Sequence, residues 1–359
     1  MSKQVNILYI FSTMLLSLLA GCEQEASLTP LPDNGEQEPV EILLSARVAE
    51  VSTVVTRAGT DFQESLVGAT IGLYGAKGKQ TQEVLGEEES FCDSIYMSNH
   101  SLEYDNSNGS LTSSTAKIYF PAGREKAFLY AYCPYTADAG ILSWPKSPTT
   151  DLCIRVKSGM SNQGGEWTDA PVDPLHDTAT AAIERKGPAD SGATQPGTAH
   201  FDLTHRMAQL QILVMTDDEK EKYVLQAIKV KFRTSLHGYM NLRTGDIIPA
   251  QVQPETYTET LGEGIPLSTG PASEQTSQFI HSALPGRNVI TAIELTVKMG
   301  DATEAANYTV YEAGEANPSI DLESNKKTRV LINFHPKSSA SASLDDWSSS
   351  EEYPIDYNK

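Results

Sequence analysis

Short apolar or alternating runs, separated by Gly, Pro, Asn, Asp and Ser, dominate the chain from Val40 onward. The clearest run is residues 228–233, in which Ile228, Val230 and Phe232 share one face and three cations share the other. This alternation has the two-residue period of a β-strand that buries one face. No stretch keeps a 3.6-residue apolar period over several turns, so the pattern predicts an all-β protein.

A second amphipathic strand is predicted near residues 289–298, and one brief helical turn at 216–221. The strand would place on one face Val289, Thr291, Ile293, Leu295 and Val297, and on the reverse face Ile290, Glu294 and Lys298. Further short runs bounded by turn residues predict strands at 40–48, 66–74, 117–120, 126–133, 151–157, 199–204, 207–215, 277–284, 307–311 and 329–334.

A segment rich in Gly, Pro and small polar residues between Ala182 and His200 predicts a domain boundary. A chain of 359 residues exceeds what a single core usually supports. We therefore expect two β-sandwich domains, at 40–185 and 199–335, followed by a C-terminal tail at 336–359.

The N-terminus has the layout of an exported lipoprotein. Residues 1–21 read as a signal peptide with an apolar run from Val5 to Leu19, too short to span a bilayer as a helix. The sequence Leu-Ala-Gly before Cys22 has the form of a lipobox, which predicts cleavage and lipidation at Cys22. Several acyl chains at one residue would give lasting attachment to the outer membrane. Residues 22–39 are acidic and lack apolar periodicity, as expected of a solvated tether.

A formal net charge of −20 argues against the basic surface that nucleic-acid binding requires, and against an anionic lipid surface as a partner. Besides Cys22, the chain has Cys92, Cys133 and Cys153. An odd number leaves two alternatives: one disulfide beside a free thiol, or three buried cysteines that act as small apolar residues, which we favour.

Common catalytic motifs are absent from the sequence, including HExxH, GxxxxGK[ST] and GxSxG. Ser143 and Lys146 match a Ser-x-x-Lys pattern, but Pro145 excludes the helix that this pattern needs. His205 has one carboxylate nearby in sequence and no second histidine, and is expected to be structural. We therefore expect no enzyme activity, no metal site and no cofactor.

Four segments resemble the fimbrillins of Bacteroidales, which are lipoprotein precursors of surface pili. They are the lipobox at Cys22, the Thr-Arg-Ala step at 56–58, the aromatic segment 128–135 and the segment 201–210 (FDLTHRMAQL). The resemblance implies two transthyretin-like β-sandwich domains, no catalysis, and a structural subunit (stalk, tip or anchor) of an adhesive fimbrium on the cell surface.

The resemblance also implies a route of assembly: a protease cuts after an arginine, an N-terminal strand leaves, and a neighbouring subunit's strand replaces it. In this chain the cut would fall between Arg57 and Ala58. The tail is the candidate donor strand, because Tyr353, Ile355 and Tyr357 alternate with polar or small residues. Asp-Ser/Thr-apolar steps also predict O-glycosylation in these bacteria, at Ser94 and Thr178.

An alternative is a surface lipoprotein that binds glycans and does not polymerise. Trp144 and Trp167 would then contact a ligand on a host or bacterial surface. Tryptophans on one exposed platform would favour this alternative, whereas burial in the two cores would favour the pilus subunit.

Overall fold

The computed structural model describes the chain in segments, namely residues 39–49, 66–79, 90–113, 116–121, 126–139, 142–145, 151–159, 167–178, 197–216, 222–269, 278–300, 302–314, 320–334 and 339–346. Nearly all regular structure in them is β-strand, which confirms the predicted all-β class. Among the described residues, no helix is long and apolar enough to cross a membrane.

A closed barrel forms from strands of the N-terminal part of the chain. Its order is β1 (Ile42–Val48), β4 (Ser110–Thr112), β3 (Ile95–Asp105), β2 (Thr70–Gly78), β5 (Lys126–Cys133), β8 (Leu175–Thr178) and β9 (Gly197–His205). The short helix α2 (Phe91–Ser94) precedes β3. Inward-facing apolar side chains fill the barrel, including Ile71, Leu102 and Phe201, each fully buried.

A small sheet covers one side of the barrel. Its order is β13 (Ile247–Pro249), β12 (His237–Asn241), β7 (Leu152–Lys157) and β6 (Leu142–Ser143). Ile154 of β7 and Met240 of β12 pack against Tyr74, Tyr130 and other outward side chains of the barrel. The two faces of β2 and β5 are therefore both buried.

The remaining strands form a sandwich of two sheets. One sheet has the order β15 (Phe279–Ala283), β10 (Ala208–Met215), β19 (Lys326–Asn333) and β20 (Ser339–Asp346). The other has β14 (Glu255–Pro266), β11 (Tyr223–Phe232), β16 (Gly286–Met299) and β17 (Ala306–Glu312), with β18 (Ile320–Leu322) also paired to β16. The core between them includes the fully buried Leu210, Ile228 and Leu295.

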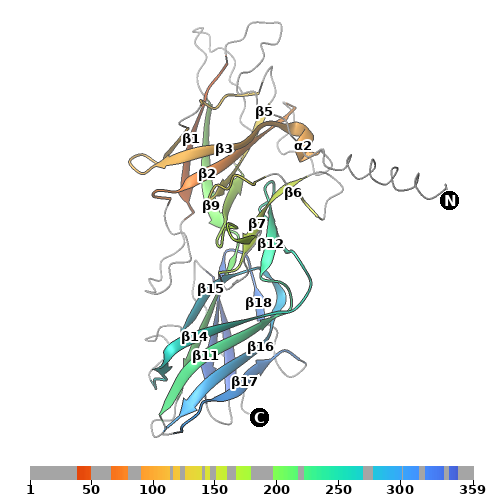
Figure 1. Ribbon diagram of the computed structural model, residues 1–359. Helices are drawn as coiled ribbons and strands as arrows, with labels where there is room; N and C mark the ends of the chain where they lie inside the picture. The colour runs from red at the N-terminus through yellow and green to blue at the C-terminus, as the bar shows by residue number, and fades with distance from the viewer. Residues whose placement is uncertain are drawn as a thin grey trace, which may run out of the picture.

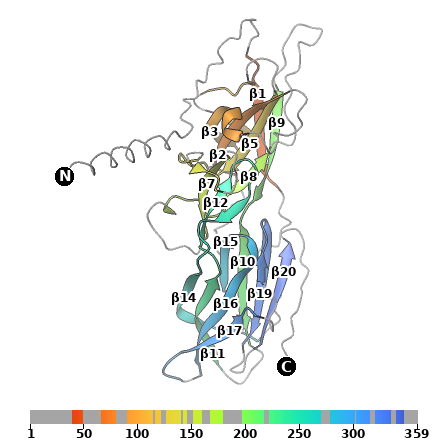
Figure 2. The same ribbon diagram turned by 90° about the vertical axis from the view of Figure 1, so that its right-hand side faces the viewer.

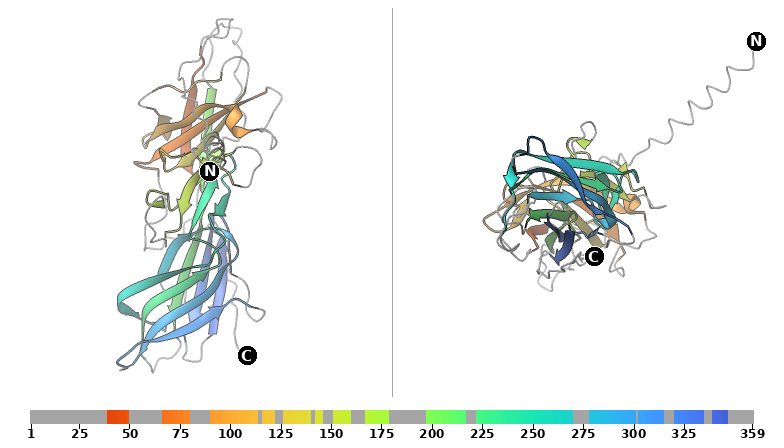
Figure 3. Two further views of the ribbon diagram at one scale, coloured as in Figure 1. Left: turned by 45° about the vertical axis from the view of Figure 1, so that its right-hand side comes forward. Right: turned by 90° about the horizontal axis from the view of Figure 1, so that it is seen from below.

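The barrel and the sandwich lie at opposite ends of an elongated molecule, with the sheet of β7 and β12 between them (Figures 1 and 2). The left view of Figure 3 shows the same order of parts. Ser282 of β15 ties this junction together: Ser158 Oγ donates to its carbonyl at 2.6 Å, and its own Oγ donates to the Val172 carbonyl at 2.7 Å.

The predicted faces of residues 228–233 are confirmed. Ile228, Val230 and Phe232 are buried, while Lys229 and Lys231 both pair with Glu294 on the outer face. These pairs are partly exposed, so each contributes at most about 1 kcal/mol.

One predicted face is wrong, because β16 has a bulge opposite β11. The register steps from Lys231↔Ala292 to Phe232↔Ile290, so Thr291 is the additional residue. Ile290 consequently turns into the core, and Thr291 Oγ1 donates instead to the Lys231 carbonyl at 3.1 Å. A bulge breaks the two-residue period on which the prediction relied.

The predicted domain bounds stay a prediction. Strand pairing adds two facts about them. β9, at the start of the predicted second domain, pairs with β1 and β8 in the barrel. The hairpin of β12 and β13, also from the second half of the chain, pairs with β7.

Candidate functional site

The strand β1 lies between two strands that come later in the chain. It pairs in parallel with β9 over its whole length, from Ile42↔Gly197 to Val48↔Leu203. On its other side it pairs antiparallel with β4 at only two positions, Leu44↔Leu111 and Ser45↔Ser110. β1 is thus the segment that closes the barrel between β4 and β9.

Besides its two residue pairs with β4, β1 forms backbone hydrogen bonds with residues that precede and follow β4 in the chain. Ile42 N–H donates to the Ile118 carbonyl at 2.8 Å, and Phe120 N–H donates to the Val40 carbonyl at 3.0 Å. Further along, Ala46 N–H donates to the Gly109 carbonyl at 3.0 Å. Both edges of β1 are therefore engaged, and its departure would leave unpaired backbone groups on both sides.

Alternate side chains of β1 point into the barrel. Ile42, Leu44 and Ala46 are buried in its core, whereas Leu43 is 48% exposed. Burial of a Leu or Ile side chain contributes about 1.5–3 kcal/mol. The groove that β1 fills is lined in part by Leu111 and Phe201, so a replacement strand needs apolar side chains at every second position.

Polar contacts on the outer face of β1 contribute less to stability than its buried side chains do. Arg47 Nε donates to Asp202 Oδ1 of β9 at 2.5 Å, and the Ser45 hydroxyl lies 2.9 Å from His200 Nδ1. The hydrogen bond from Arg47 holds the pKa of Asp202 below its ordinary value. Both partners of this ion pair are about half exposed, so it contributes at most about 1 kcal/mol. β1 is held mainly by its backbone ladder and its buried side chains.

This arrangement, a strand near the N-terminus that fills a groove in an all-β molecule, can be compared with known proteins. A family model described as fimbrillin-like matches residues 56–347. The chain belongs to the fimbrillin-like family. Membership supports a fimbrial or adhesive role at the cell surface, in a family of structural and adhesion proteins rather than enzymes.

A solved structure shares the fold of this fimbrillin-like chain. A fimbrial protein from Bacteroides vulgatus ATCC 8482 is 13% identical, with 87% of this chain and 100% of that chain covered and a TM-score of 0.53. This similarity shows a shared fold.

Two further matches have lower TM-scores. A Bacteroides ovatus protein named for cell adhesion is 16% identical, with 88% of this chain and 100% of that chain covered, at a TM-score of 0.49. The fimbrial anchor protein Mfa2 from Porphyromonas gingivalis is 10% identical, with the same coverage and a TM-score of 0.37. No curated protein matches the chain.

Most site residues predicted from the sequence lie outside the described segments of the fimbrillin-like chain. This applies to the lipidation site Cys22, the cleavage site Arg57 and Ala58, and the donor residues Tyr353, Ile355 and Tyr357. All of them stay predictions.

The two predicted glycosylation sites do fall on described strands and helices. Ser94 is the last residue of α2, and its hydroxyl donates to the Ser90 carbonyl at 3.0 Å. Thr178 is the last residue of β8, next to Asp177, whose carboxylate accepts from the Asp202 N–H of β9 at 2.6 Å. Modification of either residue stays a prediction.

Cys92, Cys133 and Cys153 are buried and form no disulfide, which confirms the favoured alternative. Burial raises the pKa of Cys153 to about 12, so its thiol is protonated at neutral pH. His205 is also buried, and its Nδ1 lies 2.7 Å from Asp173 Oδ2. Within the described residues, no group of three His, Cys, Asp or Glu side chains could hold a metal ion.

The two tryptophans fully meet neither the criterion for glycan binding, a shared exposed platform, nor the criterion for a pilus subunit, burial in the cores. Trp144 and Trp167 are half-buried, and neither belongs to an apolar core of the fimbrillin-like chain. Trp167 lies against the outer face of β7 and β12, with its ring centroid 4.9 Å from His237 and 5.5 Å from Tyr239. Sequence reasoning named Trp167 but not these neighbours, because β12 is distant along the chain.

Proposed function

We propose that the chain is a structural subunit of an adhesive surface fimbrium, in which β1 holds a groove that a neighbouring subunit's strand later occupies. The observation that carries this proposal is the position of β1. It closes the barrel alone, with ladders on both sides and Ile42, Leu44 and Ala46 buried inside. A strand from another subunit can satisfy the same backbone groups and fill the same apolar positions.

Cleavage between Arg57 and Ala58 would free β1 from the rest of the chain. The family match starts at residue 56, so β1 lies outside the matched residues. This agrees with a segment that is present in the precursor and absent from the assembled form. It supports the proposed cut without depending on the structure around Arg57.

Lipidation at Cys22 would hold the precursor at the outer membrane until that cut is made. The tether between Cys22 and β1 is acidic and polar. Proteolysis at Arg57 would separate the barrel from its anchor, whereas an anchor subunit would keep both its lipid and its strand.

The tail at 336–359 is the proposed donor. Its first part forms β20, which pairs antiparallel with β19 from Lys326↔Asp346 to Asn333↔Ser339 at the edge of a sheet. The alternating residues Tyr353, Ile355 and Tyr357 follow β20. They would reach the groove left by β1 in the next subunit, and Pro354 would face outward or lie at a bulge.

A reversible crosslink tests whether β1 must leave. Ser45 and His200 are paired across β1 and β9, half-exposed and exposed respectively. We expect Ser45→Cys with His200→Cys to form a disulfide, since paired Cα atoms lie within the range of about 4.4–6.8 Å that this bond spans. After cleavage by an arginine-specific protease, ladders on a denaturing gel should form only when the disulfide is reduced.

Two controls accompany this experiment. The single variant Ser45→Cys should polymerise under both conditions, and Arg57→Ala should polymerise under neither. Assembled subunits should begin at Ala58 by N-terminal sequencing. Ladders in the oxidised double variant, or filaments whose subunits still begin at Cys22, would contradict strand replacement in a stalk subunit.

A further inference from the structure

One continuous stretch of backbone, residues 197–215, runs from the barrel through the junction into the sandwich (Figure 2). It contains β9 and β10, which are separated only by Arg206 and Met207. The Arg206 N–H donates to the Pro174 carbonyl at 2.9 Å. The Asn325 N–H donates to the Met207 carbonyl at 3.0 Å. A pull on one end of this stretch is therefore transmitted along covalent bonds to the other part of the molecule.

In the barrel, β1 is placed so that a pull on it acts in shear. β1 runs parallel to β9, so Ile42 at its start lies beside Gly197, at the end of β9 away from the junction. A pull on the residues before β1 draws this strand along its own axis, while β9 is held from the junction. All seven residue pairs then carry the load together. The hydrogen bond from the Gly197 N–H to the Glu41 carbonyl, at 2.9 Å, adds to them at the loaded end.

The same geometry recurs in the sandwich, between β10 and β19. These strands are also parallel, and their pairs run from Gln209↔Lys327 near the junction to Met215↔Asn333 at the far end. The Phe334 N–H adds a hydrogen bond to the Met215 carbonyl at 2.7 Å. A pull on the residues after β19 therefore loads its seven pairs with β10 in shear as well.

The strand β20 is attached in the opposite direction. It pairs antiparallel with β19, so its first residue, Ser339, lies beside Asn333 at the far end of the sandwich. Its last residue, Asp346, lies beside Lys326 at the junction end, and the rest of the tail continues from there. A pull on the tail away from the molecule opens the Asp346↔Lys326 pair first and then the others in turn. Such a pull peels β20 from β19.

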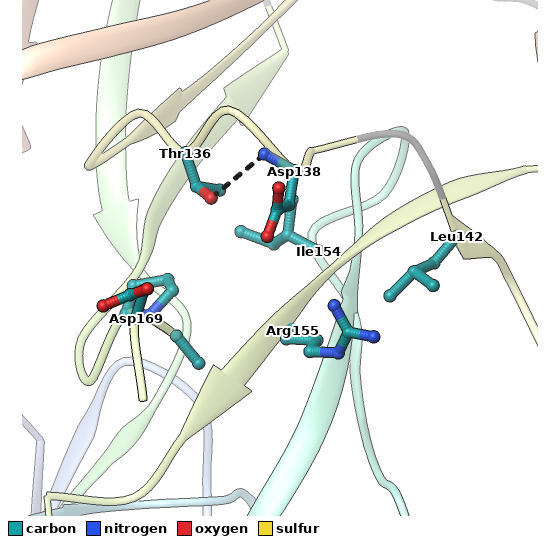
Figure 4. A pocket seen from close by; sticks show the side chains of 8 residues that line it. Thr136, Asp138, Leu142, Ile154, Arg155 and Asp169 are labelled. Atoms are coloured by element: carbon teal, nitrogen blue, oxygen red, sulfur yellow. Dashed lines mark hydrogen bonds between the residues drawn. The ribbon is translucent and has the colours of Figure 1, made fainter. Parts of the chain in front are cut away.

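A second connection between the barrel and the sandwich passes through the small sheet of β7 and β12, but a cavity interrupts its packing. The cavity measures about 220 Å³ and is lined by four segments: the turn after β5, β6, β7 and the turn before β8. Figure 4 shows Thr136 and Asp138 of the first segment, Arg155 of β7 and Asp169 of the last around this space. Residues 197–215 are therefore the more direct route for a load.

We propose that the chain bears tension along a load path of β1, β9, β10 and β19, and that β20 is released first. Release of β20 lengthens the molecule and limits the force on the load path while it lasts. The proposal rests on the proposed function only for the points at which a load enters, namely the strand in the groove and the tail.

The number of residue pairs does not set this order of release. β20 has eight pairs with β19, whereas each of the two parallel ladders has seven. The direction of the pull differs instead. Peeling breaks one pair of backbone hydrogen-bonding groups at a time, whereas shear breaks all pairs of a ladder together, so peeling needs less force.

The side chains of the strands favour the same order. The load path buries large apolar side chains on its two outer members, Ile42 and Leu44 of β1 and Val330 and Ile332 of β19. The sequence of β20 is SASASLDD, in which Leu344 alone is large and apolar. Release of β20 therefore transfers little apolar surface to water.

Optical tweezers can measure this release on the uncut chain from Cys22 onward, produced without lipid. One DNA handle is attached to Cys22 and the other to the thiol of a Lys359→Cys variant, both through thioether bonds that a reductant leaves intact. The three other cysteines are buried. We expect an early step at less than about half the force of the later unfolding events, because forced unfolding follows the barrier along the pulled direction.

The length of the early step identifies β20. Residues 334–346 extend to about 45 Å when they are freed, and the point of attachment moves by about 20 Å from the junction end of β19 to its far end. The early step should therefore measure about 65 Å. It should reverse when the force is lowered, because β19 stays in place.

Two variants test the direction of loading. Moving the second handle to Lys337→Cys, between β19 and β20, takes β20 out of the loaded segment, so the early step should vanish while the later events keep their forces. Lys327→Cys with Asp345→Cys, whose Cα atoms are paired, should form a disulfide that abolishes the early step until it is reduced. Return of the step on reduction shows that this double variant folds.

Three outcomes overturn the inference: no early step with the handle at Lys359→Cys, the same step with the handle at Lys337→Cys, or a step that persists in the oxidised double variant. The handles supply the load without a neighbouring subunit. These outcomes therefore do not depend on whether strand replacement occurs.

Discussion

His176 Nε2 lies 2.9 Å from the carbonyl oxygen of Leu242, which joins the barrel strand β8 to the chain just after β12. On the other side of the ring, Arg206 Nη2 lies 3.3 Å from His176 Nδ1. A guanidinium can only donate, so Nδ1 accepts and Nε2 carries the proton. The imidazole is therefore neutral in the folded chain.

Stability should decrease as pH falls, because His176 cannot take up a proton in place. Burial, reinforced by Arg206, lowers the pKa of His176 from 6.5 to about 3. The unfolded chain binds this proton below its ordinary pKa, so stability is fully present above pH 6.5 and is lost between 6.5 and 3. At pH about 5.5 this histidine should lower the unfolding free energy by roughly 1–2 kcal/mol relative to pH about 8. Urea unfolding at both pH values measures it, and an equal pH dependence in His176→Gln would contradict this account.

Two neighbouring leucines of β1 should respond differently to truncation. Leu44 is 5% exposed in the barrel core, whereas Leu43 is 48% exposed on the outer face. Leu44→Ala should cost about 2–5 kcal/mol in urea unfolding, because it leaves a cavity in the core. Leu43→Ala should cost about 1 kcal/mol or less. Equal costs would mean that the strand has a different register.

Two tyrosine hydroxyls should also differ in their contributions. The Tyr132 hydroxyl donates to Asn99 Oδ1 at 2.6 Å, while the Tyr96 hydroxyl is buried with no hydrogen-bond partner among the described residues. Tyr132→Phe should lower the unfolding free energy by about 1–2 kcal/mol. Tyr96→Phe should leave it unchanged or raise it by about 1 kcal/mol, since a buried hydroxyl without a partner is unfavourable. A large loss in Tyr96→Phe would reveal a partner for that hydroxyl.

Gly72 of β2 should not tolerate a side chain. A Cβ atom there would lie 2.0 Å from Cε1 of Tyr132, whose ring covers this glycine. Gly72→Ala should cost about 1–3 kcal/mol or more, because the ring must move within a packed core. Gly314→Ala is the matched control, as no described atom lies within 4 Å of its added Cβ, and it should stay within about 0.5 kcal/mol of the parent. Thermal unfolding of both variants provides the comparison.

Strands with a strong apolar pattern could be predicted from the sequence. Residues 126–133 form β5 at the predicted positions, with all eight side chains buried. β14 was not predicted, because its sequence ETYTETLGEGIP alternates partly exposed with exposed residues and has no apolar face. It lies at a sheet edge, where pairing with β11 rather than burial keeps it in place.

In the candidate site, too, local patterns could be predicted from the sequence, whereas contacts between distant segments could not. The alternation of Ile42, Leu44 and Ala46 could be read from the sequence, but their partners on β9 follow more than a hundred residues later, and a local pattern contains no information about such pairing. The cavity beside β7 depends on four separate segments in the same way. Trp167 could be named in advance, whereas its packing against His237 and Tyr239 of β12 required the fold.

Closure of the barrel by β1 also affects solubility. In the described barrel every strand has neighbours on both sides, so none of them offers a free edge to another molecule. A chain that lost β1 before it met a partner would expose the edge of β9 together with Phe201 and Leu203, and such edges promote aggregation. The first strand therefore shields the edge of β9 in the isolated molecule, and a chain that lost β1 would need a replacement strand at once to keep that edge covered.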